Sequence, residues 1–112
     1  MDVIVDRRPG GVAIVRLGGR LDLLSAAEFR QRLAQAVAEG NRRLIVDLAE
    51  VPFIDSSGLG ALISGLKTAR LAGGDLRIAR PTDQARSLLE LTVLDRVLRP
   101  YPGIEEALAG YA

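Results

Sequence analysis

Two adjacent hydroxyls stand between a carboxylate and a glycine in the run Asp55-Ser56-Ser57-Gly58. A serine in such a place has three chemical roles open to it. It can act as a nucleophile in catalysis, accept a phosphoryl group, or cap a helix through its oxygen. Each role requires different neighbours, so the remaining residues decide among them.

An enzymatic nucleophile needs a base to take up the proton of its hydroxyl. The chain has no histidine, no cysteine and a single lysine, Lys67, and no Gly-x-Ser-x-Gly pattern surrounds either serine. Its glycine-rich run, Gly58-Leu59-Gly60, lacks the Gly-Lys-Ser/Thr ending of a phosphate-binding loop. We therefore expect a protein that is not an enzyme and that holds neither a metal nor a cofactor.

A helix is predicted to begin at these serines, because apolar residues recur downstream at the spacing of one helical face. The residues of that face are Leu59, Leu62, Ile63, Leu66 and Ala69. Asp55 and both serines stand where an N-cap accepts hydrogen bonds from the first turn, so ordinary capping is one interpretation. In the other, Gly58 and Gly60 leave bare surface, and a hydrophobic staple at residues 52–54 holds Ser56 on a ledge facing another protein.

The rest of the chain alternates between short apolar runs, helical patterns and turns that contain glycine. Strands are predicted at residues 3–5, 12–17, 42–48, 75–79 and 97–98. Further helices are predicted to begin at Ser25, at Thr82 or Asp83, and at Gly103. Apolar residues fill consecutive positions within 44–48, which is typical of a central strand covered on both faces, with parallel neighbours.

This order of elements predicts an α/β fold with a mixed sheet of four to five strands and about four helices, mainly on one face. The first two strands are joined by the turn at Gly10-Gly11 and are expected to pair as an antiparallel hairpin. A length of 112 residues fits a single domain spanning residues 1–112.

Charge and hydropathy exclude several classes of partner. The formal net charge is +1, basic residues are spread along the chain, and aromatic residues make up only 4%, so we expect no nucleic-acid binding. No apolar run approaches the roughly 20 residues of a membrane span, and the N-terminus lacks the pattern of a signal peptide. We expect a cytoplasmic protein without direct membrane insertion.

Four segments together resemble STAS domains, most closely those of bacterial anti-sigma factor antagonists. They are Gly19-Arg20-Leu21-Asp22, Val46-Asp47-Leu48, Phe53 to Gly60, and Gly73-Gly74-Asp75-Leu76. The resemblance covers nearly the whole chain and implies a STAS fold. In that family the anti-sigma factor is a serine kinase that binds the ATP and phosphorylates the hydroxyl directly after the aspartate, and a serine phosphatase reverses the modification.

Carried onto this chain, the resemblance implies that Ser56 is the phosphorylated residue. It also implies a partner-binding surface, made of Asp22, Asp55, Ser56, Ser57, Gly58 and Leu59. The unmodified chain would bind an anti-sigma factor and free a sigma factor, and phosphorylation would switch that binding off. The alternative within the same fold is an unmodified scaffold subunit of a lipid-transport ABC complex, with the serine ledge packed against an ATPase.

Several of these residues also have a purely structural interpretation. Asp22 is then a loop or capping carboxylate, and the hydroxyl of Ser57 competes with that of Ser56 for the capping role. Asp47 is expected to end a strand and to take no catalytic part. Residues 92–95 replace the glycine that is often found after the third helix, so we expect the chain to leave that helix without a left-handed glycine.

Overall fold

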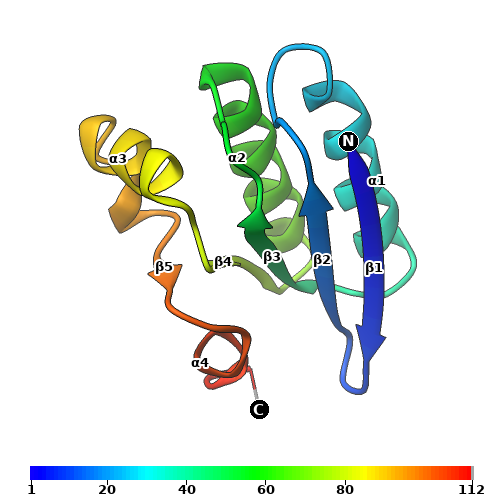
Figure 1. Ribbon diagram of the computed structural model, residues 1–112. Coiled ribbons are helices and arrows are strands. Elements are labelled where there is room, and N and C mark those ends of the chain that lie inside the picture. Colours follow the sequence, from blue (N-terminus) through cyan, green and yellow to red (C-terminus); the bar gives the residue numbers. More distant parts are fainter. Residues whose placement is uncertain (112) are drawn as a thin grey trace.

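The computed structural model describes residues 1–111, which form a five-stranded mixed sheet and four α-helices (Figure 1). The strands are β1 (Asp2–Arg8), β2 (Val12–Gly18), β3 (Arg43–Glu50), β4 (Asp75–Ala79) and β5 (Pro100–Tyr101). The helices are α1 (Ala26–Ala38), α2 (Ser56–Leu71), α3 (Asp83–Leu91) and α4 (Ile104–Leu108), and a 3-10 helix, η1, spans Leu94–Arg96. The predicted α/β class with a mixed sheet and about four helices is confirmed.

The strands lie side by side in chain order, β1-β2-β3-β4-β5. β1 pairs antiparallel with β2 across the turn at Gly10 and Gly11, whose φ angles of 84° and 73° lie in the left-handed region that favours glycine. The other pairs are parallel, and the five residues 44–48 of β3 are all buried. Both the hairpin and the central position of β3 were predicted correctly.

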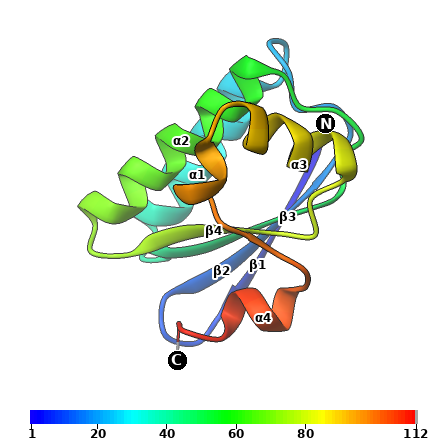
Figure 2. The same cartoon turned by 90° about the vertical axis from the view of Figure 1, so that its left-hand side faces the viewer.

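Helices α1, α2 and α3 cover one face of the sheet, and α4 lies against the other (Figure 2). The main core between the sheet and the first three helices contains the predicted stripes, including Phe29 and Leu33 of α1 and Leu62 and Leu66 of α2. Helices were expected mainly on one face, and this distribution agrees.

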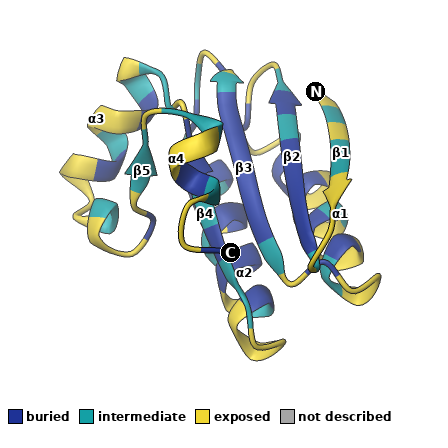
Figure 3. Cartoon of the chain, turned by 90° about the horizontal axis from the view of Figure 1, so that it is seen from below, coloured by how far each residue is buried: buried dark blue, intermediate teal, exposed yellow. Residues whose placement is uncertain are grey.

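On the second face, residues 103–111 lie over β3 and β4 (Figure 3). We call this segment the C-terminal plug. The Tyr111 hydroxyl donates to the carbonyl oxygen of Leu44 at 3.2 Å, and Arg43 donates to the Tyr111 carbonyl at 2.7 Å. The Arg77 guanidinium lies 3.9 Å from the ring centre of Tyr111 and donates to the Ala107 carbonyl at 2.9 Å. Two arginines on the strands therefore fasten this segment to the sheet.

One expectation about the chain after α3 was wrong. Val97-Leu98 is not a strand, because the Val97 and Leu98 amides both donate to the Leu94 carbonyl, at 3.0 and 2.7 Å, in the turn that closes η1. The short last strand is β5 instead, and Leu98 is fully buried in the main core. The chain leaves α3 without a left-handed glycine, as expected, and Val93 takes the left-handed conformation instead, with a φ of 60°. That conformation costs a non-glycine residue about 1–2 kcal/mol.

Candidate functional site

Two loops meet where the parallel strands β2 and β3 end, at the carboxyl edge of the sheet (Figure 1). We call this region the Ser56 edge and define it as residues 19–25 and 52–60. The Leu21 amide donates to the Phe53 carbonyl at 3.0 Å, and the Asp55 amide donates to the Leu21 carbonyl at 3.3 Å. Leu21 and Ile54 form an isolated parallel bridge. These contacts extend the pairing of β2 with β3 up to the start of α2.

Asp55 joins the two loops through both of its carboxylate oxygens. Oδ1 accepts from the Gly58 amide at 2.9 Å and so caps α2, while Oδ2 accepts from the Leu23 amide at 3.1 Å. The cap of α2 is therefore Asp55, and neither serine competes for that role. A carboxylate at a helix N-terminus is also favoured by the helix dipole.

The two serines occupy the first two positions of α2. Ser56 is exposed and Ser57 is half-buried. Within residues 1–111, the structure assigns no hydrogen bond to either hydroxyl. Because Asp55 caps the helix, the cap leaves Ser56 free to face solvent.

Asp22 is held inside the first loop by its own neighbours. Its Oδ1 accepts from the Leu24 amide at 3.1 Å, and its Oδ2 accepts from Nε of Arg20 at 3.3 Å. Partial burial acts to raise the pKa of Asp22, but the hydrogen bond and charge of Arg20, with the Leu24 amide, hold the pKa below its ordinary value. Asp22 is thus an ionised loop carboxylate beside the serine helix, in keeping with both interpretations of the sequence.

Ser25 stands at the start of α1, as expected, but does not cap it with its side chain. Its hydroxyl donates to the Arg20 carbonyl at 2.8 Å and accepts from the Asp22 amide at 3.0 Å, so it closes the loop instead. The backbone at Ser25 is already helical, which turns the hydroxyl away from the first turn of α1. The 19–25 loop is consequently held together by its own hydrogen bonds.

Gly58 and Leu59 lie beneath the surface, which corrects their expected place in the exposed ledge. Leu59 is only 5% exposed and packs in the main core. Gly58 is buried against Leu21, and a Cβ at this position would collide with the carbonyl oxygen and side chain of that residue. Both residues can support Ser56 from below, but neither presents a side chain to a partner.

Gly60, in contrast, is exposed, and a Cβ there would meet no atom within 4 Å. It lies one helical turn after Ser56, and residues four apart share a helix face. The predicted bare surface beside the serine is therefore present at Gly60 and absent at Gly58.

The sequence did not point to three residues at or beside the Ser56 edge. Gln84 of α3 forms two hydrogen bonds with the loop before α2. Its Oε1 accepts from the Ile54 amide and its Nε2 donates to the Ile54 carbonyl, each at 2.8 Å. A single glutamine in a first helical turn carries no signal of such a contact. Leu23 and Leu24 are 73% and 93% exposed. Their signal was a pair of adjacent leucines between the polar residues Asp22 and Ser25.

Asp47 lies on β3 with its side chain buried and forms an ion pair with Arg80, whose Nε donates to Oδ1 at 3.1 Å. The hydrogen bond to Asp47, and then the charge of that residue, raise the pKa of Arg80 in turn. This pair is a structural link between β3 and the residue that follows β4.

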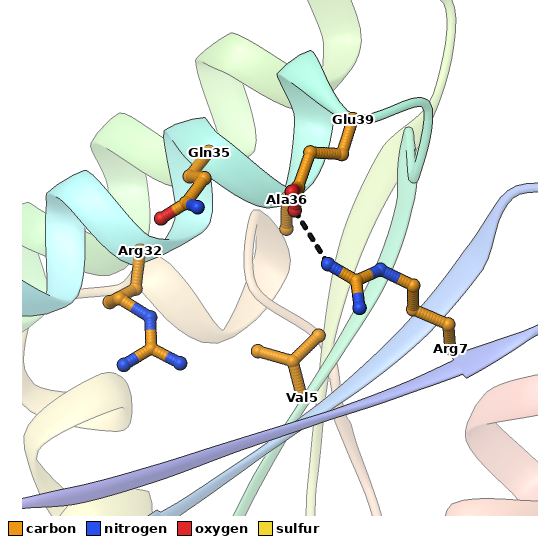
Figure 4. A pocket seen from close by; sticks show the side chains of 6 residues that line it. All are labelled: Val5, Arg7, Arg32, Gln35, Ala36 and Glu39. Carbon is orange, nitrogen blue, oxygen red and sulfur yellow. Dashed lines mark hydrogen bonds and ion pairs between the residues drawn. The ribbon is translucent and has the colours of Figure 1, made fainter.

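A hollow of about 200 Å³ lies between β1 and the end of α1, at the opposite end of that helix from the Ser56 edge (Figure 4). Arg7 and Glu39 pair across it at 2.6 Å, with Arg32 and Gln35 beside them. Among the residues that the structure describes, no group of three or more acidic residues could hold a metal ion. None of the described helices is long and apolar enough to cross a membrane.

Comparison with known proteins gives a consistent match. The model of the STAS domain matches residues 4–107. The chain is 31% identical over 103 residues to the anti-sigma-F factor antagonist RsfB of Mycobacterium tuberculosis, covering 89% of this chain and 81% of that protein.

Two solved structures have the same fold as this chain. A putative anti-sigma factor antagonist from Thermotoga maritima superimposes with a TM-score of 0.90 at 25% identity, covering 97% of this chain and 93% of that one. The phosphorylated form of the Bacillus cell fate determinant SpoIIAA superimposes with a TM-score of 0.76 at 19% identity, covering 99% of this chain and 100% of that one.

Proposed function

Since the chain belongs to the STAS domain family, as its motifs predicted, we propose that it is an anti-sigma factor antagonist controlled at Ser56. The unphosphorylated chain binds an anti-sigma factor, which is also a serine kinase and supplies the ATP site, and thereby frees a sigma factor. Phosphorylation of Ser56 ends that binding, and a serine phosphatase restores it. The chain acts by binding and contributes the substrate hydroxyl rather than a catalytic group.

The observation that carries this proposal is the exposed Ser56 hydroxyl at the start of a helix that Asp55 already caps. A regulatory hydroxyl must be accessible to a kinase and dispensable for folding. Ser57 is half-buried, so it is the poorer substrate of the two. The nearby exposed Gly60 leaves room for a partner to approach Ser56 closely.

Electrostatics predict that phosphorylation acts on binding more than on folding. A phosphoserine adds about −1.5 to −2 charges at pH 7, and a helix N-terminus favours such a charge by about 0.3–1 kcal/mol. The carboxylates of Asp55 and Asp22 oppose it, so the two effects on folding partly cancel. A partner must in addition desolvate the phosphate. A loss of about 4 kcal/mol at the interface would lower affinity about a thousandfold.

The first experiment is intact-mass measurement and phosphosite mapping of the protein isolated from its native cells. We expect one phosphate on Ser56, absent from Ser56→Ala and retained in the matched control Ser57→Ala. A phosphate that persists in Ser56→Ala would show that another residue is the one phosphorylated. No phosphate under any growth condition would favour the unmodified scaffold subunit.

The second experiment measures binding to the purified anti-sigma factor kinases of the source organism. We expect Ser56→Ala to bind one of them like the wild type, and Ser56→Asp to bind it far more weakly. Ser87→Asp is the matched control, because it adds the same charge at an exposed position on α3. Equal binding by Ser56→Asp and Ser56→Ala would contradict control by charge at this position.

A further inference from the structure

Leu23 and Leu24 form an exposed apolar pair at the tip of the 19–25 loop. Their side chains are 73% and 93% exposed, although burial of a leucine side chain lowers the free energy of the protein. Single exposed leucines are common on protein surfaces. A pair of them within a tightly bonded loop that adjoins a candidate regulatory serine needs an explanation.

The loop holds both leucines outward through their backbone amides. The Leu23 amide donates to Asp55 Oδ2 at 3.1 Å, and the Leu24 amide donates to Asp22 Oδ1 at 3.1 Å. The hydroxyl of Ser25 closes the loop on the Arg20 carbonyl at 2.8 Å. Because the backbone is already ordered, burial of these side chains by a partner would cost little further loop entropy.

We propose that Leu23 and Leu24 are the apolar anchors of partner binding and enter a hydrophobic pocket on the anti-sigma factor that contacts Ser56. This inference rests on the proposed function. The carboxylate of Asp55 accepts hydrogen bonds from both the Leu23 amide and the first turn of α2. The leucines therefore lie next to Ser56, and a protein that covers Ser56 also reaches them. An apolar centre rimmed by charged groups, here Arg20 and Asp22, is the usual organisation of a binding hot spot.

A second copy of the chain is the less suitable occupant. A dimer that met only through these two leucines would bury far less than the roughly 1,200 Å² of a stable specific interface. Self-association through this loop would also cover Ser56 and keep it from a kinase. The pair therefore fits a heterologous partner that contacts the leucines together with the rest of the Ser56 edge.

Neighbouring residues thus contribute to binding in different ways. The leucines contribute affinity through burial of apolar surface, which salt hardly weakens. Ser56 contributes control through charge, which salt screens in part. The two contributions are therefore separable by ionic strength as well as by substitution.

The test compares Leu23→Ala/Leu24→Ala with wild type for binding to the anti-sigma factor kinase retained in the experiment above, by calorimetry at low and high salt. We expect the Kd to rise about tenfold for each leucine and about a hundredfold for the pair, at both salt concentrations. Leu71→Ala is the matched control, since Leu71 is 91% exposed and lies about 22 Å along α2 from Ser56. We expect it to change the Kd less than about twofold.

Leu24→Ala alone serves if the double variant does not fold. An unchanged Kd for the leucine variants, with Ser56→Asp still defective, would overturn this inference and leave the proposed function intact. Failure of the wild type to bind any anti-sigma factor would overturn both. A wild-type dimer in ultracentrifugation that the leucine substitutions dissociate, with partner affinity unchanged, would assign the pair to self-association and also overturn the inference.

Discussion

At the Ser56 edge and at the C-terminal plug, side chains bond the backbone of a segment and attach it to the sheet. The two regions differ in the charge of those side chains and in which side chains stay exposed. At the edge, carboxylates and a glutamine bond backbone groups, and side chains such as Ser56 and Leu24 remain exposed. At the plug, arginines bond backbone carbonyls, and the side chain of Tyr111 is buried. Substitutions of exposed residues at the edge should therefore change recognition, and substitutions of buried residues in the plug should change stability.

The largest expected effect tests the plug. Tyr111→Ala should lower the free energy of unfolding by about 3 kcal/mol, because it removes a buried ring and its contact with Arg77. Urea denaturation followed by circular dichroism measures the loss. Partner affinity of the folded fraction should equal that of the wild type. A large drop in affinity at temperatures where the variant is folded would break the separation between the two regions.

Gly58→Ala should affect both properties, because Gly58 is the buried support of the edge. The added methyl group collides with Leu21, so we expect a loss of about 2 kcal/mol of stability together with weaker partner binding. Denaturation and calorimetry on the same preparation measure the two effects. Retention of both would mean that the close contact between α2 and the 19–25 loop is not needed.

Tyr111→Phe isolates the hydroxyl of the plug and should cost about 1 kcal/mol at pH 7, the net value of one hydrogen bond. Burial, followed by the charge of Asp75, raises the pKa of Tyr111 well above its ordinary value near 10. The folded state then retains a proton that the unfolded state loses, so stability should be fully present below pH 10 and fall as the pH rises above it. Unfolding between pH 8 and 11 should show a weaker alkaline loss in Tyr111→Phe than in the wild type. Equal slopes would contradict the burial of this hydroxyl.

The smallest effect has the opposite sign. Gly60→Ala should raise the free energy of unfolding by about 0.5 kcal/mol, because alanine is the better helix former and meets no neighbour. The same methyl group lies on the helix face of Ser56 and should weaken partner binding. A variant that gains stability and keeps full affinity would show that the partner does not approach this part of the edge.

Local patterns were sufficient wherever neighbours in the sequence decide the outcome. Consecutive apolar residues placed β3 in the centre, and Thr82 caps α3, with its side chain accepting from the Ala85 amide, as one of the two predicted candidates. The pattern failed where a distant contact took over. The apolar pair Val97-Leu98 is typical of a strand, yet Leu98 is buried in the main core and the backbone forms a turn there instead.

The sequence by itself determined the family, the mixed sheet, and the presence of a serine at the start of α2, since each depends on short-range periodicity and motif spacing. Only the tertiary structure decided which residue caps that helix and which residues face outward. The cap at Asp55, the burial of Gly58 and the exposure of Leu24 all depend on the meeting of two loops 32 residues apart, at Leu23 and Asp55. That meeting follows from the parallel pairing of β2 with β3, which brings the carboxyl ends of both strands to one edge.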